Sequence, residues 1–285
     1  MKRYQFYNIQ IILILYCVVP LYAGTPIGFP GNLLEQGQWR IGTSFTMSET
    51  DHWEAQGSCM ETVIGVGSNT YDQRFTLENF KTNAIFGEVA FGIGENWDVF
   101  GRLGGVQGET TIVTPGASIG YNNSGQTYLD GDYGFAGGFG ARGTLYRQNH
   151  FHIGGVIQGT WFDPDDSRLS YSYPSPSTET LTTEASLNYI QIHLSLAGIY
   201  QTDTGYLWIG PFLQHTEGEL EISSEYAFNG VKAGEITCSG DLDSDTQLGI
   251  HLGGGFQLDQ VTGQLELQLT SDSWSWSCGA VFEIH

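Results

Sequence analysis

Polar and apolar residues alternate along much of this chain. From Trp39 to Met47 the odd positions are mainly apolar, whereas the even positions hold arginine, glycine, serine and threonine. The same period of two runs through Leu265–Leu269 and Trp274–Ile284 near the end of the sequence. Because successive side chains of a strand point to opposite faces, this period predicts β-strands with one apolar and one polar face.

Other segments show comparable alternation and bring the expected number of strands to about ten. Most are about ten residues long, which is the length of a tilted strand that crosses a bilayer. Short connections alternate with long polar ones, as in an up-and-down antiparallel barrel with its long loops on one side. The further strands are expected at 82–93, 97–105, 132–146, 151–162, 188–200, 206–216 and 246–258, and the long loops at 49–81, 106–131, 163–187 and 217–245.

The pattern leaves two questions open. In the segment 206–216, the residues Tyr206, Trp208 and Phe212 compete with Leu207, Ile209 and Leu213 for the apolar face. A secreted soluble barrel or sandwich, which buries its apolar face, also shows this alternation. Tryptophans near strand ends and a polar face rich in glycine, serine and glutamine favour a membrane barrel, because such barrels carry aromatic girdles and a polar interior. The tryptophans are Trp39, Trp97, Trp161 and Trp274.

The first residues are typical of a secretory leader. Met1-Lys2-Arg3 precede an apolar run from about Ile9 to Val19, and Ala23 is a small residue at the expected cleavage point. The apolar run is shorter than the roughly 20 residues that a transmembrane helix needs. We therefore expect a signal peptide at 1–23, an N-terminal periplasmic segment at 24–37 and an outer-membrane β-barrel at 38–285.

One hairpin carries a specific resemblance. The segment Ala90–Gly104 has a glycine-rich turn, then asparagine, then an alternating strand that ends in Arg-Leu-Gly. This resembles the recurrent hairpin of bacterial outer-membrane β-barrel proteins, a broad superfamily rather than one named family. The resemblance implies a place in the bacterial cell outer membrane, with outer-membrane lipid and the barrel assembly machinery as partners. Barrels of this kind usually end on an aromatic residue, whereas Phe282 is followed here by Glu283-Ile284-His285, so the assembly signal is atypical.

The charge of the chain excludes one class of partner. Its 31 acidic and 10 basic residues give a formal net charge of −21. Nucleic-acid binding needs clustered lysine and arginine, so no nucleic-acid partner is expected.

The polar face of the predicted barrel strands carries both signs of charge. Three guanidinium groups and four carboxylates fall on that face, and an unpaired charge in a confined interior is costly. We therefore expect ion pairs in a largely plugged lumen, and a narrow cation-preferring channel is the alternative. The residues are Arg40, Arg102, Arg142, Glu88, Asp98, Glu266 and Glu283.

The predicted long loops hold two further candidate sites. Asp241, Asp243 and Asp245 alternate and could share a divalent cation such as Ca²⁺, although solvated acidic side chains without a metal are the simpler interpretation. Cys59 and Cys238 fall in loops on the same side of the barrel, where an oxidising envelope permits a disulfide.

The sequence contains no catalytic motif, and no cofactor is expected. A rim-sited surface hydrolase of the omptin kind is a second alternative, with His215 and Glu217, or Asp51 and His52, as candidate residues. We expect a non-enzymatic outer-membrane barrel with a structural or surface-interaction role, exerted through long acidic extracellular loops.

Overall fold

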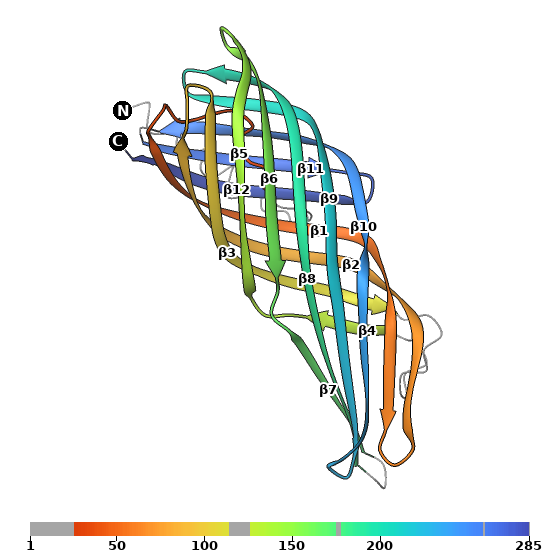
Figure 1. The fold of residues 1–285 in the computed structure, drawn as a ribbon. Coiled ribbons are helices and arrows are strands. Elements are labelled where there is room, and N and C mark those ends of the chain that lie inside the picture. Colours follow the sequence, from red (N-terminus) through yellow and green to blue (C-terminus); the bar gives the residue numbers. More distant parts are fainter. Residues whose placement is uncertain (1–25, 114–125, 175–177, 259, 285) are drawn as a thin grey trace.

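The computed structural model describes residues 26–113, 126–174, 178–258 and 260–284, so the expected signal peptide lies outside the described residues. Within these ranges the chain forms an antiparallel sheet of twelve strands (Figure 1). The described part has no helix that is long and apolar enough to cross a bilayer. The strands are β1 (Trp39–Val63), β2 (Gly67–Gly92), β3 (Trp97–Val113), β4 (Gln126–Asp130), β5 (Gly134–Gln148), β6 (Phe151–Asp163), β7 (Ser167–Pro174), β8 (Thr178–Thr202), β9 (Gly205–Phe228), β10 (Val231–Leu258), β11 (Val261–Leu269) and β12 (Ser273–Ile284).

Ten of these strands close into a ring. Each pairs with its neighbours in the order β1, β2, β3, β5, β6, β8, β9, β10, β11 and β12, and β12 pairs again with β1. The closing register places Trp39 opposite Ile284. The remaining two strands lie outside the ring, where β4 pairs with β3 and β7 pairs with β8. The ring confirms the predicted up-and-down antiparallel barrel.

The barrel has an apolar exterior and a polar interior. Outward residues such as Ile41, Leu103 and Leu248 are exposed, whereas inward residues such as Arg40 and Ser275 are buried. Exposed apolar surface over a whole strand face is unfavourable in water but favourable against hydrocarbon. The facing of the strands therefore matches a transmembrane barrel and argues against a soluble fold that buries its apolar residues.

Strand β9 resolves the facing that the sequence left open. Tyr206, Trp208 and Phe212 point into the barrel, while Leu207, Ile209 and Leu213 point outward. The neighbouring strand β10 has a glycine opposite each inward aromatic ring, and a Cβ atom at any of them would lie within 2.4 Å of that ring. These glycines make the room that three large rings need inside a ring of ten strands. The pairs are Gly249 with Phe212, Gly253 with Trp208 and Gly255 with Tyr206.

The regions expected as long loops are mostly β-strands, so this part of the prediction was wrong. Strands β1 and β2 continue to a turn at 64–66, and β9 and β10 continue to a turn at 229–230. Together with β4, β7 and the first part of β8, they form a β-stranded extension beyond the barrel (Figure 1). Their acidic face was interpreted as loop composition, but it is one face of paired strands.

The polarity of the strands reverses between the barrel and the extension. On β9 the outward face changes from Leu207, Ile209 and Leu213 to Glu217 and Glu219. The inward face of the extension becomes apolar and forms a buried core that includes aromatic rings from several strands. An acidic exterior over an apolar core is the arrangement of a protein surface in water. The reversal therefore marks where the strands leave the hydrocarbon.

A change of partner by β1 closes the extension. Along Trp39–Thr50 this strand pairs with β12, and along Ala55–Val63 it pairs with β10. Cys59 and Cys238 are directly opposite each other in the second register, and they form a disulfide across a sequence separation of 179 residues. The disulfide therefore joins two paired strands inside the core of the extension, and not two loops.

Replacing both cysteines by alanine is expected to loosen the extension and leave the barrel intact. A disulfide that closes a long loop typically contributes about 2–4 kcal/mol, and here both sulfurs are buried in the extension core. Limited proteolysis of the folded protein in detergent should cut the double variant faster within 51–80 and 217–245 than the wild type. Equal cleavage rates, or cleavage within the barrel strands first, would contradict this assignment.

Candidate functional site in the barrel lumen

Four of the predicted lumen residues lie together near the short-turn end of the barrel. Arg142 Nη2 lies 3.1 Å from Glu88 Oε1, and Arg142 Nε lies 3.3 Å from Asp98 Oδ2. Arg40 Nη2 lies 3.3 Å from the same Glu88 oxygen. Asp98 and Arg142 are opposite each other on β3 and β5, so the strand register itself brings this pair together. The cluster joins the four adjacent strands β1, β2, β3 and β5 along one side of the lumen by charge-assisted contacts.

Arg102 is placed differently from the expectation. It is opposite Glu88 in the register of β2 and β3, yet in the described structure its guanidinium hydrogen-bonds to neutral oxygens. Arg102 Nη1 donates to the carbonyl of Pro26 at 2.9 Å, and Nη2 donates to Thr160 Oγ1 at 2.7 Å. Its charge also lies 5.2 Å from the centre of the Phe86 ring, a cation–π contact.

Glu266 and Glu283 also lie apart from the arginine cluster. Glu266 is buried, and its Oε1 lies 3.4 Å from His251 Nδ1. Its Oε2 accepts a hydrogen bond from the backbone of Gly28 at 2.8 Å. Glu283 is half-buried at the short-turn end of the barrel, and among the described residues no arginine lies within ion-pair distance of it. The seven charges therefore do not form one network.

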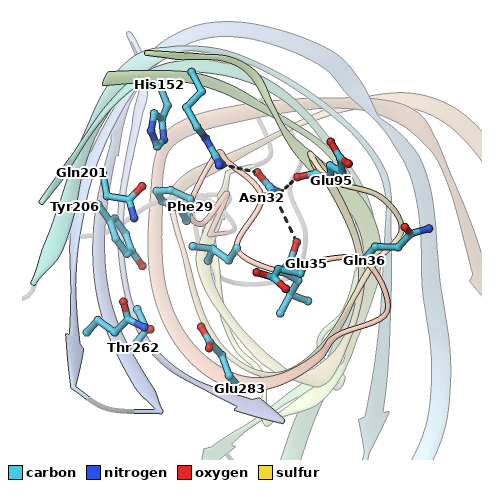
Figure 2. Close-up of a pocket in the computed structure, with 14 residues that line it drawn as sticks. Phe29, Asn32, Glu35, Gln36, Glu95, His152, Gln201, Tyr206, Thr262 and Glu283 are labelled. Carbon is cyan, nitrogen blue, oxygen red and sulfur yellow. Dashed lines mark hydrogen bonds between the residues drawn. The ribbon is translucent and has the colours of Figure 1, made fainter. Parts of the chain in front are cut away.

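The segment before β1 fills the lumen. We expected residues 24–37 to be a periplasmic segment, but residues 26–37 enter the barrel from the short-turn end (Figure 2). Ile27, Phe29 and Leu34 are buried against the inner wall. Their apolar side chains follow immediately on the expected cleavage point, and this short apolar stretch was the sequence signal that the prediction missed. We call residues 26–37 the plug.

Wall side chains hold the plug mainly through its backbone. Arg102 and Gln158 both donate to the carbonyl of Pro26. Leu33 N donates to Asp98 Oδ2 at 3.0 Å, in addition to the Gly28 bond to Glu266. Three charged residues of the lumen thus serve the plug, which explains why Arg102 and Glu266 are not used in the arginine–carboxylate cluster.

A cavity of about 650 Å³ opens beside the plug at the barrel mouth (Figure 2). The Phe29 ring forms one side, where its centre lies 4.4 Å from the Tyr206 ring. The lining holds three carboxylates, Glu35, Glu95 and Glu283, and one guanidinium group, that of Arg147. The cavity is the space left between the plug and the mouth of the wall, where β5, β6 and β8 to β12 each contribute a lining residue.

A second closure lies where the barrel meets the extension. The ring of Tyr189 contacts three other rings, with centre-to-centre distances of 5.8 Å to Trp53, 5.7 Å to Phe80 and 4.6 Å to Phe162. All four rings are buried. We call these four residues the aromatic layer. The sequence analysis missed it because Trp53 and Phe80 fall within 49–81, which was treated as a loop, and Phe162 and Tyr189 fall at strand ends next to the expected loop 163–187.

Buried polar side chains lie between the plug and the aromatic layer. His193 Nε2 lies 2.9 Å from Gln214 Oε1, and His193 Nδ1 lies 3.4 Å from Gln158 Nε2. His193 and His251 are both fully buried. The interior of the barrel is therefore packed with hydrogen-bonding side chains rather than lined by charges of one sign.

The remaining candidates lie outside the lumen. Asp241 and Asp243 are exposed on β10, the side chain of Asp245 lies outside the described residues, and in the described part no group of three acidic, histidine or cysteine side chains could hold a metal ion. His215 lies 2.9 Å from Glu217 and 2.8 Å from Thr246 Oγ1 on the outer surface. Asp51 and His52 are exposed on β1.

Replacing Arg142 by methionine should destabilise the barrel by about 3 kcal/mol, because it leaves Glu88 and Asp98 buried with fewer partners. Arg168→Met is the matched control, since Arg168 pairs with Glu184 at 3.2 Å on the exposed surface. This replacement should lower the free energy of unfolding by less than about 1 kcal/mol. Equilibrium unfolding by urea in detergent measures both. Equal losses of unfolding free energy in the two variants would show that the lumen cluster contributes no more to stability than an exposed ion pair.

Comparison with known proteins shows no sequence family. No family model matches the chain, and no curated protein matches it. Solved structures show a similar fold. The outer membrane protein OprG from Pseudomonas aeruginosa matches at 9% identity and a TM-score of 0.40, and the match covers 88% of this chain and 97% of the OprG chain.

Two further structures give the same result. The outer membrane protease OmpT from Escherichia coli matches at 9% identity and a TM-score of 0.38, covering 86% of this chain and 97% of its own. The beta domain of the Bordetella autotransporter BrkA matches at 10% identity and a TM-score of 0.36, covering 87% of this chain and 100% of that domain. None of these likenesses carries an argument about function, and the barrel of this chain is established by its own strand pairing.

Proposed function

We propose that this protein is a closed outer-membrane barrel that holds a β-stranded extension outside the cell, and that the extension has a structural or surface-interaction role. The observation that carries the proposal is the double filling of the lumen, by the plug near one end and by the aromatic layer near the other. In this proposal the belt of apolar side chains contacts outer-membrane lipid, and the barrel assembly machinery inserts the chain.

The contacts of the plug support a closed lumen. Its backbone is bonded to side chains of β3, β6 and β11, which lie on different parts of the wall. The bonds to the carbonyl of Pro26 are buried, and those of Gly28 and Leu33 are partly buried. A hydrogen bond shielded from water is stronger than one in solution. Several such bonds to different strands therefore hold the plug in place.

The size and composition of the extension support its role as the functional part. The hairpins β1–β2 and β9–β10 both reach well beyond the barrel, and their ends are fixed to each other by the Cys59–Cys238 disulfide. A strand-built extension with its own core presents a defined surface, in contrast to the long acidic loops that we expected. A non-enzymatic role fits this design, because a binding surface needs shape and charge but no reactive group.

Planar-bilayer recordings test the closed lumen. The wild type should show no steady conductance, and neither should Trp53→Ala/Tyr189→Ala nor deletion of 26–34, because one closure remains in each. The combination should conduct more than either variant, with a current limited by the polar side chains that still pack between the two closures. Tyr128→Ala, which removes an exposed aromatic residue outside the lumen, is the control for nonspecific leakage and should stay silent.

A steady, cation-selective current through the wild type would contradict the proposal and favour the narrow channel. The carboxylates to neutralise would then be those that line the cavity at the mouth, Glu35, Glu95 and Glu283.

The hydrolase alternative has its own test. We expect no cleavage of a denatured protein substrate by the purified wild type, because His215 lies on the open surface with its ring nitrogens on Thr246 and Glu217. Cleavage that is lost in His215→Ala and kept in His150→Ala would instead show that the rim is catalytic. His150 is the control because it is an exposed histidine at the other end of the barrel.

A further inference from the structure

The two longest hairpins end side by side at the far end of the extension. The β1–β2 turn lies at 64–66 and the β9–β10 turn at 229–230 (Figure 1). Ile64 N donates to the carbonyl of Ala233 at 3.0 Å, and Val63 is opposite Gly234. The two hairpin ends are therefore adjacent and form one surface.

This surface is apolar although it lies in water. Ile64 is 60% exposed, Val66 84%, Phe228 43% and Val231 70%. We call these four residues the tip surface. The exposed aliphatic side chains of the barrel strands face hydrocarbon. The acidic residues Glu217 and Glu219 on β9 separate the tip surface from them.

Turn geometry does not require these residues. Asn229 and Gly230 both have positive φ, 52° and 77°, which is the requirement of a tight two-residue hairpin turn. Phe228 and Val231 flank that turn as a cross-strand pair, and threonine or serine would pair there at lower cost in water. Exposed apolar residues gathered on adjacent turns typically mark a contact site.

The rim of the tip surface is acidic. The two hairpin ends, 61–67 and 225–235, contain Glu61, Glu225 and Glu235 and one base, Lys232. Lys232 Nζ lies 3.0 Å from Glu225 and also contacts Glu235, so it offsets one of the three negative charges. Glu61 lies near Tyr71 and Tyr226, where burial and this carboxylate together raise the pKa of both phenols. The rim therefore presents net negative charge around an apolar centre.

We propose that the tip surface docks a partner protein whose contact face has an apolar centre and a rim of lysine or arginine. This inference rests on the surface-interaction role proposed above and names the partner class. Charge complementarity selects this occupant: a second copy would bring an equally acidic rim, and an anionic membrane would be repelled.

The test uses the full protein in nanodiscs of neutral phosphatidylcholine, and the probe is a fluorescent peptide of alternating leucine and lysine. A peptide of alternating leucine and glutamate is the charge control, and empty nanodiscs give the baseline. Fluorescence anisotropy should show binding of the lysine peptide above baseline, weakened by added salt. Ile64→Ser/Val66→Ser/Val231→Ser should weaken it by about tenfold or more, since three aliphatic contacts are lost.

Ile93→Ser is the control, because Ile93 is an exposed aliphatic residue at the short-turn end of the barrel, far from the tip surface. Its binding should equal that of the wild type, and circular dichroism should show that the triple variant is folded. Unchanged binding in the triple variant, or equal binding of the glutamate peptide, would overturn the proposal. So would association of the extension with neutral vesicles, or self-association that the triple variant abolishes.

Conductance of the same preparation keeps the two proposals apart. A steady current would overturn the closed lumen and leave the peptide result to be judged by itself. A silent barrel that binds neither peptide would retain the closed lumen and remove only the tip surface as a docking site.

Discussion

The structure depends on the need to satisfy backbone hydrogen bonds where water is absent. A strand in hydrocarbon cannot leave its N–H and C=O groups unpaired, so the sheet has to close. The ring from β1 through β12 and back to β1 meets this requirement. Closure also determines the interior. A ring of ten strands encloses a narrow space, which the side chains of the wall and the plug fill.

The filling of that space follows from the cost of burying polar groups. The inner wall is polar, and the outer wall has to be apolar, so the interior charges must find partners inside. Arg40 and Arg142 find Glu88 and Asp98 on neighbouring strands. Arg102 and Glu266 find the backbone of the plug instead. The plug is thus part of how the barrel satisfies its own interior, and closing the lumen is a consequence of the same contacts.

Two solvents act on the same strands. Within the barrel, β1 and β9 place apolar residues outward, and beyond it they place them inward. On β1 the change coincides with Asp51 and His52, two successive exposed residues, and with the change of partner from β12 to β10. A strand keeps its period of two on both sides of such a point. The strands stay paired across the junction, with register shifts between Glu78 and Lys81 and between Leu242 and Asp245.

The sequence by itself predicted the barrel, its number of about ten strands and the facing of most of them, because a period of two is a local property and shows on each strand. The facing of 206–216 needed the structure. It also placed Asp98 and Arg142 on the inner face, but the pairing of these two needed the register of β3 with β5. Tertiary structure alone decided that Glu217 and Glu219 belong to strands rather than loops, that residues 26–37 turn back into the lumen, and that Ile64 meets Ala233. Each of these depends on which medium or which distant strand lies opposite, and neither the composition nor the spacing of a segment contains that information.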